Sequence, residues 1–147
     1  MKAIVYEKYG PPDVLELRDV EKPTAKADEV LVKVRAASVN YGNLALVTGK
    51  PFMVRMMAGG MSKPTDTIQG GDFAGVVEAV GKNVRQFQIG DEVYGDLADL
   101  HFGTFAEYVA APERLVALKP KNLTFEEAAA VPQASVVALQ GLRNVGN

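Results

Sequence analysis

The sequence predicts a mainly β fold, a barrel or a sandwich, with a helical segment at its carboxyl end. Two observations predict this class. Short apolar runs recur about every eight to twelve residues between turn residues, a spacing that favours a barrel or sandwich over a parallel sheet. The pattern changes only after Lys121, where a helix-start signal and Ala-rich residues appear.

The first half of the chain consists of β-rich runs separated by turn residues. Residues 2–6 and 14–20 are two such runs, and the breaker sequence Gly-Pro-Pro lies between them. Residues 29–36 give the clearest strand, because Val recurs there at every second position. Two faces are expected in this strand, one with Val30, Val32 and Val34 and one with Leu31, Lys33 and Arg35.

The middle of the chain mixes a short helix, a loop and further strands. Residues 41–47 predict a brief helix, and the Met-, Gly- and Pro-rich residues 52–67 predict an irregular loop. Residues 75–81 give the sharpest strand signal, preceded by a bend at Gly71. The expected core residues near this strand are Phe73, Val76 and Val80. Shorter strands are expected at residues 93–94, 105–111 and 115–118.

The last part of the chain is expected to be helical. Thr124 and Glu127 have the spacing of a capping box, in which each side chain accepts the other residue's backbone amide. The helix that opens there is broken near Pro132, and a second helix is expected over residues 134–143. The chain therefore divides into a β domain, residues 1–123, and a helical segment, residues 124–147.

The composition is that of a globular domain and excludes several function classes. The 147 residues are 48% hydrophobic and 23% charged, with a formal net charge of −2, so no nucleic-acid surface is expected. No stretch approaches the roughly 18 apolar residues of a membrane span, and the amino terminus does not resemble a secretory signal. The absence of cysteine excludes disulfides and fits a cytoplasmic location.

The sequence also lacks the residues of common metal and nucleotide sites. Because there is no cysteine and His101 is the single histidine, no Cys/His zinc site can form, and no metal is expected. No two glycines stand two residues apart, so the Gly-x-Gly-x-x-Gly turn of dinucleotide-binding folds is absent. We expect no cofactor to bind to these residues alone.

Five segments carry motifs that point to one family: residues 29–40, 70–81 (GGDFAGVVEAVG), 87–95, 103–109 and 123–132 (LTFEEAAAVP). In this order they resemble the medium-chain dehydrogenase/reductase superfamily, in its zinc-independent, quinone-oxidoreductase-like branch. The resemblance covers nearly the whole chain. It implies a GroES-like, partly open β-barrel with short helices, whose C-terminal helical segment leads toward a Rossmann domain that is absent here.

The resemblance also implies a chemistry for the full-length protein. NADH or NADPH would supply a hydride, and the protein would position a small hydrophobic carbonyl, enone or quinone in a dry cleft. Without zinc to stabilise an alkoxide, reduction of an activated C=C bond is favoured, because the conjugated carbonyl accepts the charge. The full-length protein is compatible with a homodimer.

Four residues are candidates for that cleft. The resemblance places Asn40 and Asn43 near the nicotinamide, where the zinc-free branch often has Asn-x-x-Asp, and it places Val137 where a Thr is common. Tyr41 is the nearby phenol and the candidate catalytic residue, since it could hydrogen-bond a substrate carbonyl or donate a proton. The alternative for Tyr41 is a packing role beneath the cleft.

Two hypotheses of different classes remain at this point. In the first, the chain is the catalytic-domain fragment of an NAD(P)H-dependent, zinc-free oxidoreductase, inactive by itself and continued past Asn147 in the gene. In the second, it is a freestanding GroES-like module that binds a protein partner through an open barrel edge or its Met-rich loop. That loop is equally a candidate wall over a hydrophobic substrate; its methionines are Met53, Met56, Met57 and Met61.

Overall fold

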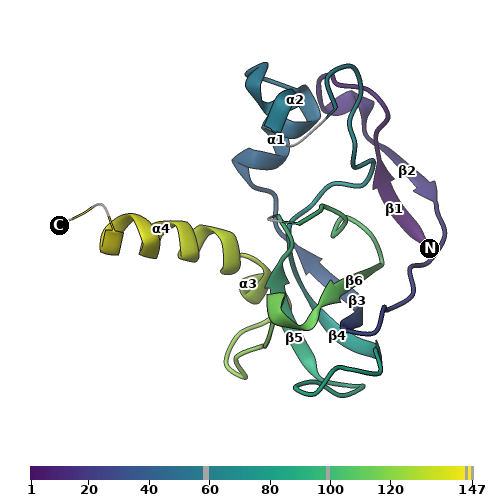
Figure 1. Ribbon diagram of the computed structural model, residues 1–147, viewed down its shortest axis with the longest axis vertical. Helices are drawn as coiled ribbons and strands as arrows, with labels where there is room; N and C mark the ends of the chain where they lie inside the picture. The colour runs from purple at the N-terminus through teal and green to yellow at the C-terminus, as the bar shows by residue number, and fades with distance from the viewer. Residues whose placement is uncertain (58–59, 99, 145, 147) are drawn as a thin grey trace.

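The computed structural model describes residues 1–57, 60–98, 100–144 and 146, and its main feature is a curled antiparallel sheet (Figure 1). The five strands of this sheet have the order β6-β3-β4-β5-β7 and form an open half-barrel. The predicted partly open barrel is therefore confirmed. Its strands are β3 (Glu29–Ala37), β4 (Asp72–Val80), β5 (Glu92–Asp96), β6 (Tyr108–Pro112) and β7 (Val116–Leu118).

The amino-terminal residues form a separate two-stranded ribbon beside the barrel. Its strands β1 (Lys2–Val5) and β2 (Glu16–Asp19) are antiparallel, and the 3-10 turn η1 (Pro12–Val14) lies between them. Isolated bridges from Ala3 to Ala106 and from Val5 to Ile68 join the ribbon to the connections of the barrel. Both predicted strands are present, and the second begins two residues later than expected.

In the described part of the chain, four α-helices are attached to this β framework. Helices α1 (Tyr41–Thr48) and α2 (Met53–Met57) lie side by side at one end of the molecule (Figure 1). Helix α3 (Phe125–Ala129) packs on the outside of the sheet, and α4 (Pro132–Asn144) extends away from it. The short 3-10 turn η2 (Glu113–Leu115) links β6 to β7.

The prediction of an irregular loop over residues 52–67 is wrong for residues 53–57. The sequence there is Met-Val-Arg-Met-Met, which is rich in good helix formers, and it forms α2. The Arg55 guanidinium donates a hydrogen bond to the Gly49 carbonyl at 3.1 Å, so the helix is fastened to the turn after α1. Residues 58 and 59 of the predicted loop, and the side chain of Met57, lie outside the described residues.

The core occupies both faces of β4. Inside the barrel, Phe73 and Val77 pack with Val30 and Val32 from β3. On the outer face, the small side chains of α3 approach the sheet closely and bury Ala74; these are Ala128 and Ala129. The start of β4 is therefore packed on both faces, by the barrel core on one side and by α3 on the other.

The expected core positions of β4 are correct at Phe73 but wrong at Val80. Val80 is 38% exposed, Val76 is only partly buried, and Val77 is the buried residue instead. Phe73 and Val77 share one face, whereas Val76 lies on the face of Ala74, which α3 covers only near the start of the strand. Val80 is the last residue of β4 and pairs with Val30. A register irregularity beside Glu78 also interrupts the pairing with β3, between Leu31 and Val32.

Candidate functional site

A groove of about 610 Å³ runs between the first turns of α4 and the neighbouring edge of the barrel. Helix α4 contributes Gln133, Val137 and Gln140 to one wall. The opposite wall comes from β5 and from residues 114–117 around the start of β7. The groove therefore combines apolar surface with side-chain amides, which is the usual lining of a small-molecule site.

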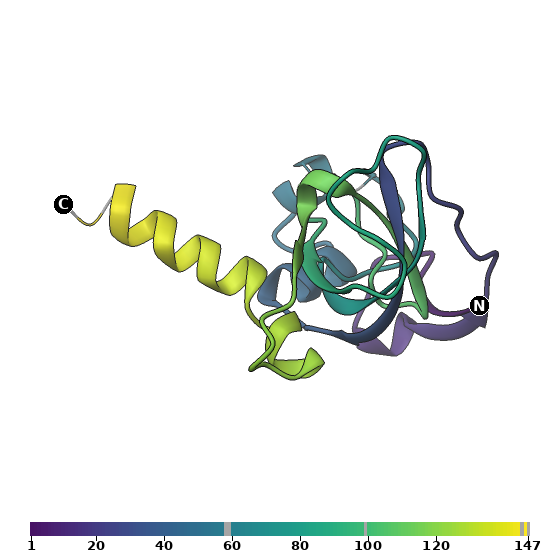
Figure 2. The same ribbon diagram turned by 90° about the horizontal axis from the view of Figure 1, so that it is seen from below.

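Helix α4 itself is exposed along almost its whole length. Ala134 to Asn144 are all exposed, and the helix points away from the barrel in both views (Figures 1 and 2). Its exposed side chains include Leu139 and Leu142, so an apolar stripe faces solvent. Only the beginning of α4 lies against the barrel, so the contacts made there determine the position of the groove wall that α4 forms.

A buried carboxylate provides one of those contacts. Asp72, at the start of β4, is 1% exposed. Its Oδ2 accepts hydrogen bonds from the Asn40 side-chain amide at 2.6 Å and from the Ser38 hydroxyl at 2.8 Å. Its Oδ1 accepts the backbone N–H of Gln133 at 3.0 Å, in the first turn of α4. One side chain thus joins the loop before α1 to the groove wall.

Asn40 and Asn43 are brought together at the start of α1. The Asn43 side-chain oxygen accepts the Asn40 backbone N–H at 2.8 Å, and the Asn43 backbone N–H donates to the Asn40 carbonyl at 3.0 Å. Asn43 is buried, so its amide serves the backbone of this turn. A role of either residue toward a cofactor stays a prediction.

The other two candidates are exposed and lie apart in the sequence. Tyr41, the first residue of α1, is 81% exposed, so its phenol is available to a small molecule. Val137 is 63% exposed and lines the groove from α4. Sequence reasoning did not identify Asp72 or Gln133, although Asp72 stands in the Gly-Gly-Asp motif; the Gln133 contact uses a backbone amide, which no sequence pattern marks.

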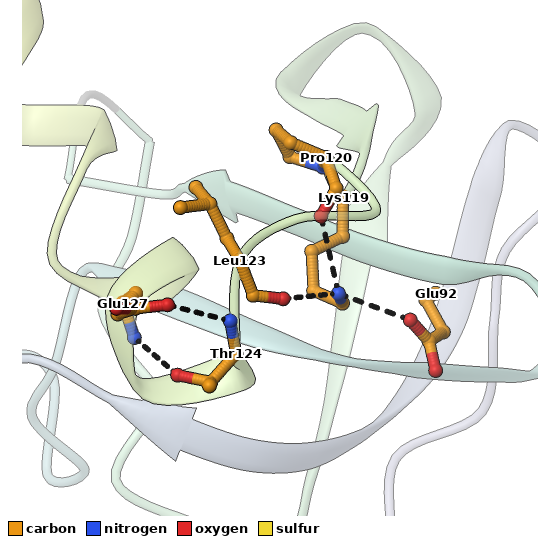
Figure 3. Close-up of polar contacts among 6 residues, drawn as sticks. All are labelled: Glu92, Lys119, Pro120, Leu123, Thr124 and Glu127. Carbon is orange, nitrogen blue, oxygen red and sulfur yellow. Dashed lines mark hydrogen bonds and ion pairs between the residues drawn. The ribbon is translucent and has the colours of Figure 1, made fainter.

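A second polar network fastens α3 to the barrel (Figure 3). The Lys119 side chain is 5% exposed, and its ammonium donates to the carbonyls of Pro120 and Leu123, at 3.2 and 2.6 Å. It also pairs with the Glu92 carboxylate at 3.1 Å. The predicted capping box follows directly and is confirmed, since Thr124 and Glu127 each accept the other's backbone amide.

Within residues 1–57, 60–98, 100–144 and 146, no group of three or more His, Asp or Glu side chains is arranged to hold a metal ion. The prediction that the protein uses no zinc stays a prediction. No helix in the described part of the chain combines the length and apolar character needed to cross a bilayer.

The curled half-barrel, the helix packed on its outer face and the groove beside α4 define a GroES-like domain of the dehydrogenase/reductase class. The chain belongs to the alcohol dehydrogenase GroES-like domain family, whose sequence model matches residues 26–121. The resemblance to the quinone-oxidoreductase-like branch of the medium-chain superfamily is thereby confirmed.

Individual relatives are similar along the whole chain. A 2-methylene-furan-3-one reductase of Solanum lycopersicum is 44% identical over 99% of this chain and 38% of its own length. A chloroplastic NADPH-dependent alkenal/one oxidoreductase of Arabidopsis thaliana is 42% identical over 97% of this chain and 37% of its own. The quinone oxidoreductase structure from Coxiella burnetii matches with a TM-score of 0.88 and 35% identity, over 99% of this chain and 45% of its own. The chain thus spans less than half the length of these relatives.

Proposed function

We propose that this chain is the substrate-side domain of a longer, zinc-free NAD(P)H-dependent oxidoreductase that reduces small molecules with an activated C=C bond or a quinone ring. The oxidoreductase class carries over from the relatives, and the alkenal/one oxidoreductase is the observation that favours an enone substrate. A groove with apolar and amide side chains suits such a compact, mostly apolar substrate.

The groove also fits the nicotinamide end of the cofactor. That end is a flat ring with a carboxamide, which suits apolar contacts from Val136 and Val137 beside the amides of Gln133 and Gln140. When bound, NADPH or NADH would supply the hydride. The chain has no Gly-rich phosphate turn, so phosphate binding belongs to residues outside it. The cytoplasmic location and the homodimer stay predictions, and one relative is a chloroplastic enzyme.

Tyr41 is the proposed proton donor, because its phenol is exposed at the start of α1, next to Asn40. After hydride addition to the β-carbon of an enone, the electron pair lies on the enolate, and a phenol can supply the proton that completes reduction. The experiment uses the full-length protein, which includes these 147 residues and those encoded after Asn147. NADPH oxidation is measured with an α,β-unsaturated ketone, with a benzoquinone and, as a control, with a saturated ketone.

We expect turnover of the first two substrates and little of the third. Tyr41→Phe should lower kcat on the enone by about 10²-fold. The control is Tyr108→Phe, which should leave kcat unchanged; Tyr108 is on β6, and its ring lies beneath the Lys22 ammonium. Unchanged turnover in Tyr41→Phe would return Tyr41 to a packing role. A natural stop codon directly after Asn147 would overturn the proposal as a whole.

A freestanding protein-binding module is the second candidate, and the exposed methionines favour it. Met53, Met56 and Met61 are exposed, as is Phe52, and flexible thioethers adapt to varied partners. This reading requires the 147 residues to be monodisperse and to bind a definite protein through that surface. Met53→Glu with Met56→Glu should then abolish binding in a pull-down without changing the thermal midpoint.

A further inference from the structure

We propose that Asp72 is a positioning residue that sets two walls of the site against each other. Its Oδ2 accepts hydrogen bonds from Asn40 and Ser38 in the loop before α1. Its Oδ1 accepts one from the backbone N–H of Gln133 in the first turn of α4. These segments are far apart in the sequence and meet at one carboxylate. This one side chain therefore connects the two segments directly.

The position of the carboxylate supports a structural purpose. Asp72 is 1% exposed, and a buried carboxylate is costly unless donors surround it. Three neutral donors reach its side chain, and hydrogen bonds from neutral donors to a carboxylate are of the strong, charge-assisted kind. The Thr104 hydroxyl donates to the Asp72 carbonyl at 3.0 Å and fixes the backbone beneath.

Helix α4 needs such an anchor. It has 13 residues, none of which is buried, and an isolated helix of this length is marginal in water. The residue before Pro132 is Val131, whose side chain offers no acceptor for the first amides. Asp72 supplies that acceptor from a distant strand, and its negative charge also suits the amino-terminal end of the helix dipole.

The two oxygens couple the loop and the helix. A rotation of the carboxylate that improved the contact to Asn40 would worsen the contact to Gln133, so a displacement of one segment is felt by the other. If the proposed reductase function holds, this coupling fixes the loop of Asn40 and Tyr41 relative to the wall that carries Val137. The coupling itself does not depend on that function.

Asp72→Asn tests the proposal on the 147-residue chain. The shape is kept, but one oxygen becomes an NH₂ group, which must face either the Asn40 amide donor or the Gln133 N–H. Backbone residual dipolar couplings then report how α4 is held. In the wild type, one alignment tensor should fit both the sheet and α4. In Asp72→Asn, the couplings of residues 135–144 should fall in magnitude and should no longer fit the alignment tensor of the sheet.

Asp91→Asn is the matched control. Asp91 Oδ2 accepts a hydrogen bond from the backbone N–H of Gln88 at 2.9 Å, in an exposed turn away from α4. This variant makes the same change of charge and should leave the α4 couplings unaltered. Couplings in Asp72→Asn that still fit the wild-type tensor, with the Asn40 side-chain resonances also unmoved, would overturn the proposal.

Asn40→Ala provides a second test that spares the buried carboxylate. It removes a donor to Oδ2, so the Gln133 amide proton, on the other oxygen, should shift by more than its linewidth. If Asp72→Asn does not fold, this result decides the matter: an unmoved Gln133 resonance means that the two segments are not coupled. Neither measurement uses turnover, so failure here is distinct from failure of the proposed reductase function.

Discussion

Lys119 shows how much a single buried side chain contributes to the join between barrel and helix. Each of its three acceptors belongs to a different residue, and together they use the donors of the ammonium group (Figure 3). No sequence pattern marks this role, because a lysine between a strand and a helix is usually a surface residue. The neighbouring capping box could be predicted, since both of its partners lie within four residues.

Lys119→Met should lower the free energy of unfolding by about 1–3 kcal/mol, because the carbonyls of Pro120 and Leu123 lose a buried donor. The loss of the pair with Glu92 adds little, since that carboxylate is half exposed and returns to water. Urea unfolding provides the measurement. Lys121→Met, an exposed neighbour with the same change, is the control; equal stability of the two variants would contradict the argument.

Tyr6 gives the protein a predictable response to alkaline pH. Burial raises the pKa of Tyr6 from its ordinary 10.0 to about 12, with smaller contributions in the same direction from Tyr9 and Asp66. The Gln69 side-chain amide donates to the Tyr6 hydroxyl at 2.7 Å and lowers the pKa in part. Between these two values the native chain holds a proton that the unfolded chain has lost.

The contribution of Tyr6 is therefore complete below pH 10 and disappears as pH rises through 12. Its total is on the order of 3 kcal/mol, because the pKa rises from 10.0 to about 12 and one pKa unit corresponds to about 1.4 kcal/mol. Tyr6→Phe lacks this titration, so the wild-type free energy of unfolding should fall relative to that of the variant over this range. Lysine titration cancels in the difference. A difference that is constant with pH would show that the phenol is not desolvated.

At the scale of elements, strands were predicted better than the faces that they bury. The position of β3 was correct to within one residue, and Val30 and Val32, which were predicted to share a face, are both buried. In β4 the choice of Val76 and Val80 failed, because burial there depends on where α3 ends and on a register irregularity. Neither is encoded in the local alternation of residues.

Gly75, in the middle of β4, is the position where the strand cannot accept a side chain. A Cβ there would overlap the Lys33 carbonyl oxygen and approach Val32 Cγ1 at 2.8 Å. We expect Gly75→Ala to destabilise the domain by about 1–3 kcal/mol, as overpacked cores do. Gly141→Ala is the matched control: nothing lies within 4 Å of its Cβ, and alanine favours the helix there. Thermal unfolding that ranks the two variants in the opposite order would refute this.

At the scale of the whole molecule, the half-barrel supplies one side of a site rather than a closed one. The groove between α4 and the barrel is open rather than enclosed, and no Gly-rich phosphate turn is present in these residues. We therefore expect no rise in Tm when the 147-residue chain is titrated with NADPH, because a ligand stabilises a fold only by binding it. ADP-ribose is a useful second titrant, since it lacks the nicotinamide. A clear concentration-dependent rise with NADPH would place a complete nucleotide site within this chain.

The sequence by itself determined the fold class, the main strands, the capping box and the family, because these depend on local periodicity and on motifs in fixed order. Tertiary structure alone decided that Asp72 joins Ser38, Asn40 and Gln133, and that Lys119 holds the turn before α3. Hydrogen bonds between residues distant in the sequence arise from how the sheet curls and where helices pack. A linear pattern of residue types carries no information on that geometry.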